Sequence, residues 1–373
     1  MINMPVFYNR IIEVSQNDDW NKLIEKFQDA DIYHSKEYTN LFAKVEEGIP
    51  QAVYFENENG KVFYPFIKRK IDIKVGYFDI ITAYGYGGPI YEGDKKVIKQ
   101  FYDKFKDHCF QNNIVTETIG LHPLLKNAED LKEIMIVDYI RKTTAVDLTL
   151  PLEDIRKSYK SNNRRNIRKS KKEGVKVFIS NEKEDIEIFM ELYYETMDRK
   201  NASSFYYFNK SYFYDQMEET VVGKPYLLLA KYNEEIIGGV IMLVGKQFAH
   251  YHLGASKTKY LALRPNNILF DAMVEYAKSL GLKSLHLGGG YIENDNLFKF
   301  KTSFTNNNNF DYFLGKNIIN IKVYNELLQK IIKNQPAGIQ DSYFPLYRSR
   351  KIAFDFSLNL YITFSTFGSY LAV

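Results

Sequence analysis

The chain has 373 residues, a length that suits two domains or one large domain. Hydrophobic residues make up 45% and charged residues 26%, which excludes a disordered chain. The 50 basic and 46 acidic residues leave a net charge of +4, which is too small to predict nucleic-acid binding. The single cysteine excludes an internal disulfide and a cysteine-rich zinc site.

The N-terminal residues have no basic and then apolar segment of the kind that a signal peptide has. No uncharged apolar run reaches the roughly 18 residues of a membrane span until the extreme C-terminus, where serine, threonine and asparagine interrupt it, so we predict no membrane span. We therefore expect a cytoplasmic protein with at most peripheral membrane contact.

In chain order, hydrophobic periodicity and turn residues predict a first series of elements before residue 150. The series includes a hairpin, because two β-rich runs are separated by the turn sequence Asn57-Glu58-Asn59-Gly60. The predicted elements are helices over 20–27 and 36–45, a hairpin over 51–70, a strand over 77–84, a helix over 95–111, and strands over 115–120 and 135–150.

The second half repeats this order. Its hairpin turns at Asn233-Glu234, and its clearest helix has an apolar stripe that ends at Gly281. The predicted elements are helices over 183–200 and 210–221, a hairpin over 225–244, a strand over 247–254, a helix over 268–280 and a strand over 284–287.

The two hairpins lie about 175 residues apart, which suits the duplication of a domain-sized unit. We predict an α/β (α+β) fold with two tandem domains over 1–150 and 151–320, each with a mixed, mostly antiparallel sheet. A helix and strand tail over 321–373 follows. One mixed α/β domain whose halves are similar only by chance is the alternative.

A basic run extends from Arg156 to Lys172, with nine lysines or arginines and no acidic residue. In a continuous helix, one face would carry Lys157, Lys160, Arg164, Arg168 and Lys171. We interpret Arg164 and Arg168 as candidate contacts to the phosphates of a nucleotide, a lipid carrier or RNA. A solvated linker helix is the alternative.

A lysine interrupts an apolar helical stripe near residue 300. Leu297, Phe300, Lys301 and Phe304 follow helical spacing, whereas Lys299 lies off the stripe. An inward lysine must snorkel to solvent, meet an anionic partner or line a cleft. In a cleft it would stabilise the oxyanion of an acyl-transfer intermediate or hold a carboxylate. A snorkelling stem at a domain edge is the alternative.

The corner LALRPNNILF is a candidate anion site. Pro265 suits the start of a helix, and Arg264, Asn266 and Asn267 surround an N-terminus whose free N–H groups attract anions. We therefore take these three polar residues as candidate contacts to a nucleotide or pyrophosphate. Capping of the helix by asparagine is the alternative.

The loop YGYGGP presents Tyr84 and Tyr86 beside glycines that permit the close approach of a ligand. We take both tyrosines as candidate substrate contacts, with a tight loop that binds nothing as the alternative. The loop is neither a dinucleotide-binding fingerprint nor a phosphate loop.

His250 and His252 flank Tyr251 on a predicted strand, and alternation places both on one face. No nearby acid or cysteine completes a metal site, so we predict no metal and favour packing or hydrogen bonding. A general-base role for His252 is the alternative.

The segment 250–304 resembles the C-terminal half of the FemABX peptidoglycan-bridge aminoacyltransferases, which consist of two GNAT acyltransferase domains. The residues that carry the resemblance are GAS, the amphipathic helix after it, LGGG and the pattern D-x-L-F-x-F-K-x-x-F. The segment RRNIRKSKKEGV at the start of the second half adds to them. The resemblance extends over residues 31–314 and implies two tandem GNAT-like domains.

The resemblance also implies roles for individual residues. Phe300 and Lys301 match the Phe-Lys pair that lines the Fem active site, and Tyr212 matches a substrate-contacting tyrosine of the second domain. We therefore take Lys301, Tyr212 and His252 as candidate catalytic residues, with Phe300 as a candidate substrate contact. Lys301 would supply positive charge and Tyr212 a proton-transfer contact.

The activity that the resemblance implies is transfer of an acyl or aminoacyl group to an amine of a cell-envelope precursor. The acceptor would be a peptidoglycan peptide or a polysaccharide amino sugar, and the donor aminoacyl-tRNA. The acyl-CoA loop Q/R-x-x-G-x-G/A is not recognisable before residue 268. The alternatives are an acyl-CoA-dependent N-acetyltransferase of an amino sugar and a catalytically inactive binding module. We expect no metal, no organic cofactor and no DNA partner.

The C-terminal segment 354–365 alternates strictly between apolar and polar residues, which predicts a half-buried strand. An exposed strand of this kind is an aggregation hazard. We expect it to pair with a sheet edge in its own chain or in a second copy, which would make a homodimer. A disordered or helical tail is the alternative.

Overall fold

The computed structural model of the chain describes residues 9–14, 19–180, 182–334 and 343–349. Contacts divide these residues into two compact units. Unit 1 holds the described residues up to Asp29, the segment Phe42–Arg141 and the described residues from Asp311 onwards. Unit 2 holds Ala30–Leu41 and Lys142–Phe310. The strand predicted over 354–365 lies outside the described residues.

The division differs from the contiguous domains that the sequence predicts. The segment Ala30–Leu41, near the start of the chain, belongs to unit 2, and the chain after Asp311 belongs to unit 1. Two strands cross the boundary, β7 (Ile136–Asp147) on the way into unit 2 and β13 (Asn309–Ile318) on the way back. None of the helices in the described part of the chain combines the length and the apolar character needed to cross a membrane.

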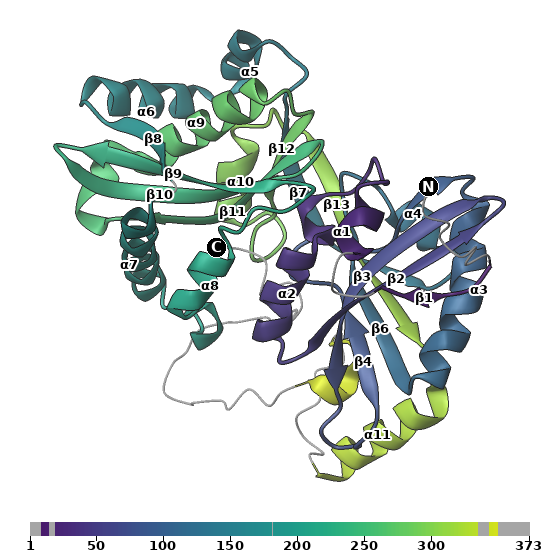
Figure 1. Cartoon of the computed structure of the whole chain (residues 1–373). Helices are drawn as coiled ribbons and strands as arrows, with labels where there is room; N and C mark the ends of the chain where they lie inside the picture. Colours follow the sequence, from purple (N-terminus) through teal and green to yellow (C-terminus); the bar gives the residue numbers. More distant parts are fainter. Residues whose placement is uncertain (1–8, 15–18, 181, 335–342, 350–373) are drawn as a thin grey trace. The chain divides into compact units, whose positions relative to one another are not determined.

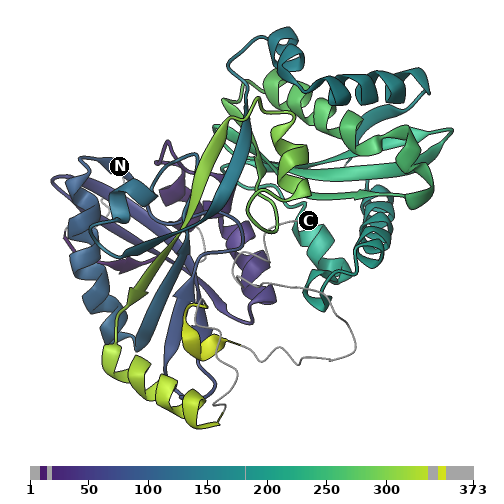
Figure 2. The same ribbon diagram turned by 180° about the vertical axis from the view of Figure 1, so that it is seen from behind.

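Unit 1 contains a mixed sheet in the order β1-β2-β3-β4-β6-β13, with β5 paired to β3 (Figures 1 and 2). Within it β4 and β6 are parallel, and the other pairs are antiparallel. Its elements are β1 (Ile12–Glu13), α1 (Asp19–Ile24), the end of α2 (Lys36–Val45), β2 (Ile49–Asn57), β3 (Gly60–Lys70), β4 (Phe78–Ile81), β5 (Ile90–Gly93), α3 (Lys96–Gln111), β6 (Ile114–Gly120), α4 (Ala128–Leu131) and α11 (Ile321–Asn334).

The β2–β3 hairpin turns where the sequence predicts it. Gly60 has a φ of +147°, and a Cβ atom there would come within 2.1 Å of the carbonyl oxygen of Glu92 on β5. Only glycine permits this close pairing of β3 and β5. The helix α3 packs against this sheet through apolar residues that include Phe101 and Phe105, which are completely buried.

Unit 2 repeats the arrangement, with the sheet order β7-β12-β11-β10-β9-β8. Its hairpin β9–β10 is followed by a third antiparallel strand, a helix and a parallel strand, as β2–β3 is followed by β4, α3 and β6. Its elements are η1 (Ile32–His34), most of α2, α5 (Leu152–Ser158), α6 (Ser161–Lys172), β8 (Lys176–Ser180), α7 (Lys183–Arg199), η2 (Ser204–Tyr206), α8 (Lys210–Asp215), β9 (Lys224–Tyr232), β10 (Glu235–Val244), β11 (Phe248–Ser256), η3 (Thr258–Leu263), α9 (Pro265–Ser279), β12 (Ser284–Gly288) and α10 (Asn296–Thr302).

The helices of unit 2 cover both faces of its sheet (Figure 1). The apolar stripe of α9, with Leu269, Met273 and Ala277, packs on one face and forms the main core of this unit. The helices α7 and α8 lie on the opposite face, where α7 contacts β10 and β11. The mixed, mostly antiparallel α/β architecture and the repeated element order are thus as the sequence predicts.

Candidate active site

The candidate site lies where the strands β11 and β12 of unit 2 separate, and we call this point the fork. The parallel strands β11 and β12 pair over Phe248–His250 and Ser284–His286 only. On the other side of β11, the register with β10 shifts between Tyr251 and Leu253, so His252 is the extra residue of a β-bulge. A bulge bends its strand and interrupts regular pairing. The strands therefore separate where His252 begins, and the separation leaves room for side chains from other elements.

One element that contributes to the fork is α8, which carries Tyr212. The phenol oxygen of Tyr212 lies 3.1 Å from Nε2 of His252 and 3.3 Å from Oε1 of Gln216. Asn209 caps this helix and accepts a hydrogen bond from the Tyr212 backbone N–H at 3.0 Å. The ring of Tyr212 stacks on Phe208 with 4.0 Å between ring centroids. The cap and the stacked ring together hold the phenol against the imidazole.

The protonation states of this pair follow from burial. Desolvation, with a smaller contribution from His250, lowers the pKa of His252 to about 3. Desolvation also raises the pKa of Tyr212 above its usual value of 10.0. Both groups are therefore neutral at physiological pH. A conjugate acid with a pKa near 3 makes His252 a weak base, and this argues for an orienting role over the general-base role.

Lys301 spans the fork. Its side chain is only 2% exposed, which excludes the snorkelling alternative. Its Nζ atom donates a hydrogen bond of 2.8 Å to the carbonyl of Gly289, just after β12, and lies 5.1 Å from the centre of the Tyr251 ring on β11. Asp295 caps the short helix α10 and accepts a hydrogen bond from the Phe298 backbone N–H at 2.7 Å. The amino group of Lys301 is thus fixed between the two diverging strands.

Phe300 is half-buried beside Lys301 and packs against the core of unit 2. Its ring centroid lies 5.1 Å from that of Phe270 on α9 and 5.3 Å from that of Phe304. These contacts anchor α10 to the sheet and so position Lys301. A packing role for Phe300 therefore accompanies any contact it makes with a substrate.

The three residues of the predicted anion corner have different environments: two are exposed and one is buried. Arg264 and Asn266 are exposed at the N-terminus of α9, where Arg264 adopts a left-handed conformation with a φ of 61°. Asn267 instead is buried and donates a hydrogen bond of 3.1 Å to Asn163 of α6. Asn163 in turn donates one of 2.6 Å to Ser303. Arg264 and Asn266 remain accessible to an anion, whereas Asn267 fastens α9 to α6.

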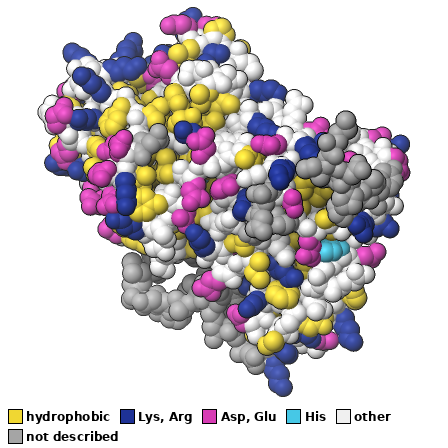
Figure 3. Space-filling view, in the orientation of Figure 1, with side chains coloured by type: hydrophobic (Ala, Val, Ile, Leu, Met, Phe, Trp, Pro, Cys, Tyr) yellow, Lys and Arg dark blue, Asp and Glu magenta, His cyan; other side chains and the backbone are white. Residues whose placement is uncertain are grey.

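The basic run does not form one continuous helix. The chain is extended at Tyr159 and Lys160, between α5 and α6, because the Tyr159 ring is buried against Phe304 with 5.2 Å between centroids. The expected single stripe from Lys157 to Lys171 is therefore wrong. Lysine and arginine side chains still gather over α6 in Figure 3.

The basic side chains of this region differ in their partners. Arg156 and Lys171 lie 2.8 and 3.2 Å from the buried carboxylate of Asp271. Arg164 donates hydrogen bonds to the backbone carbonyls before α6, including that of Lys157 at 2.8 Å. Arg168 is exposed, and no side-chain hydrogen bond or ion pair to it occurs among the described residues. Arg168 is thus better placed than Arg164 to bind a phosphate.

The YGYGGP loop belongs to unit 1. Tyr84 is half-buried and stacks on Phe42 with 5.2 Å between centroids. Tyr86 is buried against Tyr312 at 5.4 Å, and burial raises its pKa. Asn127 donates a hydrogen bond of 2.7 Å to the carbonyl of Gly87 and fixes the loop. Both tyrosines therefore have structural partners within their own unit.

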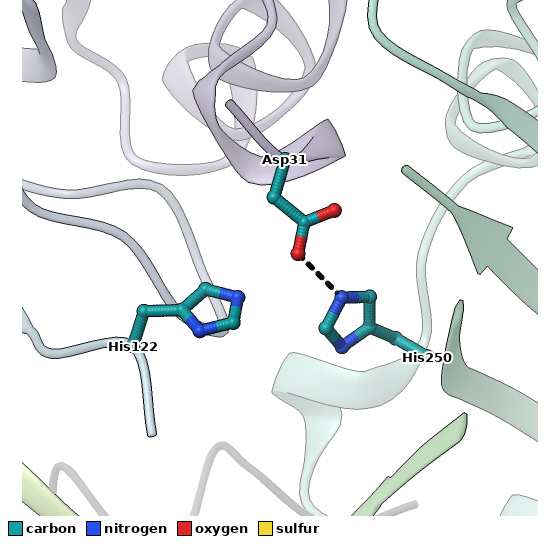
Figure 4. A group of neighbouring side chains, drawn as sticks. All are labelled: Asp31, His122 and His250. Carbon is teal, nitrogen blue, oxygen red and sulfur yellow. Dashed lines mark hydrogen bonds and ion pairs between the residues drawn. The ribbon is translucent and has the colours of Figure 1, made fainter. Parts of the chain in front are cut away.

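A buried acid–histidine pair was not found from the sequence. Oδ2 of Asp31 lies 2.6 Å from Nε2 of His250, and both side chains are buried (Figure 4). Oδ1 of Asp31 accepts a hydrogen bond of 2.8 Å from the backbone N–H of Ile32 at the start of η1. The pair fastens the segment Ala30–Leu41 to β11, the strand that carries His252. The two residues are 219 positions apart, so no local pattern could reveal their contact.

Comparison with known proteins shows a domain match and a shared fold. A family model described as an acetyltransferase (GNAT) domain matches residues 157–301, which lie within unit 2. The crystal structure of FemX superimposes with a TM-score of 0.64 and 15% identity, over 85% of this chain and 99% of that chain. The chain thus contains a GNAT acetyltransferase domain over residues 157–301 and has the fold of FemX.

A second solved structure, a conserved protein of unknown function from Bacteroides thetaiotaomicron, shares the fold. It has a TM-score of 0.51 and 10% identity, over 82% of this chain and 98% of that chain. The chain has no significant sequence match among curated proteins. The acyltransferase class and the FemABX-like fold inferred from the motifs are thereby confirmed, and they place the fork, Lys301 and Tyr212 in the GNAT unit.

Proposed function

We propose that this acyltransferase forms an amide on an amine of a cell-envelope precursor, with aminoacyl-tRNA as the donor. The observation that supports it most is the buried ammonium of Lys301, which is held between the carbonyl of Gly289 and the ring of Tyr251 at the fork. A buried positive charge is strongly felt where negative charge develops in a transition state.

The proposed step is the attack of an amine on the ester carbonyl of the donor. The N–C bond forms through an oxyanion, the ester C–O bond breaks, the amine loses a proton and the leaving alcohol gains one. Lys301 stabilises the oxyanion. Tyr212 donates a proton to the leaving oxygen, for which a phenol of raised pKa is suited because an alkoxide is a strong base. Neutral His252 orients the phenol through the 3.1 Å contact.

The charge on α6 supports a donor rich in phosphates. Arg165, Arg168, Lys169 and Lys172 are exposed on this helix, and no acidic residue occurs between Arg156 and Lys172. Contacts between such side chains and a phosphate backbone contribute most of the affinity for RNA and make it depend on salt. The acceptor, a peptidoglycan peptide or an amino sugar, is proposed from the family resemblance alone.

A second candidate is acyl-CoA-dependent N-acetylation of an amino sugar, because the matching domain model is that of acetyltransferases. The exposed Arg264 and Asn266 at the N-terminus of α9 would serve a pyrophosphate in either case. The donor therefore decides between the two functions.

The test supplies the full-length protein with charged tRNA or with acetyl-CoA, and with a peptidoglycan stem peptide or glucosamine as the amine. We expect a product from charged tRNA, and a loss of about 10²–10³-fold in rate for Lys301→Met, as for the removal of an oxyanion-stabilising group. Lys299→Met is the matched control, because Lys299 is exposed two positions away on the same helix. A product from acetyl-CoA alone would establish the second candidate. If neither donor gave a product, the protein would be a catalytically inactive binding module.

A further inference from the structure

Tyr193, on α7, has a buried hydroxyl group without a hydrogen-bond partner among the described residues. The residue itself is completely buried. Neighbouring tyrosines differ in this respect: Tyr194 donates to the carbonyl of Phe208 at 2.5 Å, and Tyr207 donates to Asp198 at 2.6 Å. A buried hydroxyl that makes no hydrogen bond destabilises the folded protein and requires an explanation.

The packing around Tyr193 leaves its hydroxyl little freedom to find a partner. Its ring makes an edge contact with Phe213 at 5.4 Å between centroids and a stacked contact with Phe208 at 6.2 Å. Phe189, one turn earlier on α7, lies at 6.5 Å. An aromatic side chain with close-packed neighbours cannot rotate without disturbing them. The orientation of the ring is therefore set by α7, by Phe208 and by Phe213 on α8.

The ring of Tyr193 shares two neighbours with the ring of Tyr212: both rings stack on Phe208, and both make an edge contact with Phe213. Burial raises the pKa of Tyr193, and Tyr212, Tyr206, Tyr291 and Tyr251 act on it electrostatically in the same direction. Tyr212 is the partner of His252, and Tyr251 lies under the ammonium of Lys301. Such electrostatic effects fall with distance. Tyr193 therefore lies in the same aromatic cluster as Tyr212, the residue that contacts His252 at the fork.

The two faces of the sheet of unit 2 differ in chemistry. On the face of α6 and α9, exposed basic side chains gather on α6, namely Arg165, Arg168, Lys169 and Lys172. The face of α7 and α8 presents phenols and a neutral imidazole at the fork. Cationic side chains suit the phosphates of a donor, whereas phenols suit uncharged or partly charged oxygen atoms as hydrogen-bond acceptors. The acceptor substrate thus fits the α7–α8 face.

We propose that Tyr193 is a substrate-binding residue whose hydroxyl donates a hydrogen bond to a carbonyl, carboxylate or hydroxyl oxygen of the amine-bearing acceptor. This inference rests on the proposed acyl-transfer function. The bound acceptor would supply the partner that the described residues lack. A site built to hydrogen-bond a substrate oxygen binds analogues without that oxygen poorly, so Tyr193 would also contribute to specificity.

The test is Tyr193→Phe in the full-length protein, with the stem peptide and glucosamine as acceptors. For whichever acceptor the wild type acts on, we expect the KM to rise about tenfold and kcat to stay nearly unchanged. The Tm without substrate should stay the same or rise, because the variant removes an unsatisfied hydroxyl. Tyr226→Phe is the control, since Tyr226 packs against Tyr276 of α9 on the opposite face and should leave the KM unchanged.

The outcomes separate the inference from the proposed function. An active wild-type protein whose acceptor KM is the same in Tyr193→Phe would overturn the role of Tyr193 and leave the acyl-transfer function intact. A fall in Tm together with a loss of activity at every acceptor concentration would also overturn it, because that pattern indicates a purely structural residue. A wild-type protein inactive with both donors and both acceptors would refute the proposed function itself.

Discussion

The neutral state of His252 gives a prediction that needs no substrate. Burial lowers its pKa from 6.5 to about 3. This difference corresponds to about 5 kcal/mol of protonation free energy, at roughly 1.4 kcal/mol for each pH unit. Because the pKa is lower in the folded protein, the unfolded chain binds the proton first. The contribution to stability is therefore complete above pH 6.5 and is lost as the pH falls from 6.5 towards 3.

Two measurements check this prediction. In NMR titrations of protein labelled at its six histidines, the resonance that disappears in His252→Gln should show no titration between pH 5 and pH 9. Urea denaturation should show that lowering the pH from 7 to 4.5 destabilises the wild type by about 3 kcal/mol more than His252→Gln. Glutamine keeps an acceptor for the phenol of Tyr212, so the comparison isolates the titration.

A His252 resonance that titrates between pH 5.5 and pH 7.5 would refute the reasoning. It would mean that the bulge on β11 admits water to the ring, and it would restore the general-base role, since a pKa near neutrality suits that chemistry. If the pKa of His252 is near 3, as we expect, the pH profile of the acyl-transfer rate should show no inflection near pH 6.5 that His252→Gln removes.

Three other predictions follow from buried and charged groups. Burial raises the pKa of Glu117 to about 7. The wild type should therefore lose about 3 kcal/mol of stability as the pH rises from 4.5 to 7, whereas Glu117→Gln should not. If urea denaturation at pH 5 and pH 8 showed the same loss of stability in the wild type and in Glu117→Gln, this prediction would be wrong. Asp31→Ala should destabilise the protein by about 3 kcal/mol in urea denaturation, because it leaves His250 without its carboxylate and η1 without its cap; a loss below about 1 kcal/mol would count against the pair. Replacing Arg165 and Arg168 by glutamate should weaken tRNA binding and reduce its salt dependence in filter-binding assays between 50 and 200 mM salt. An unchanged affinity would mean that α6 is a solvated helix that does not bind tRNA.

Local patterns predicted most elements of both units. The apolar stripe of α9 depends on residues three or four positions apart, and the turn before Gly60 depends on four consecutive residues. Both features act within one element, so the sequence alone determines them. The repeated order of hairpin, third strand, helix and strand followed from such elements, and it indicated two similar sheets, which the family resemblance assigned to GNAT-like domains.

The family motif and the helical spacing also singled out Lys301. Its inward direction is a local property, since it lies on the apolar stripe of its helix. The carbonyl of Gly289 that it meets, and the ring beneath it, are not local properties, because they depend on where β11 and β12 separate.

Only the tertiary structure determined how the side chains at the fork meet. His252 and Tyr212 are 40 positions apart, and Asp31 and His250 are 219 apart. The bulge at His252 arises from the register between β10 and β11, and the pKa of His252 arises from its burial beneath other elements. Periodicity specifies which face of an element is buried, whereas the identity of the partner on that face depends on the packing of the whole unit.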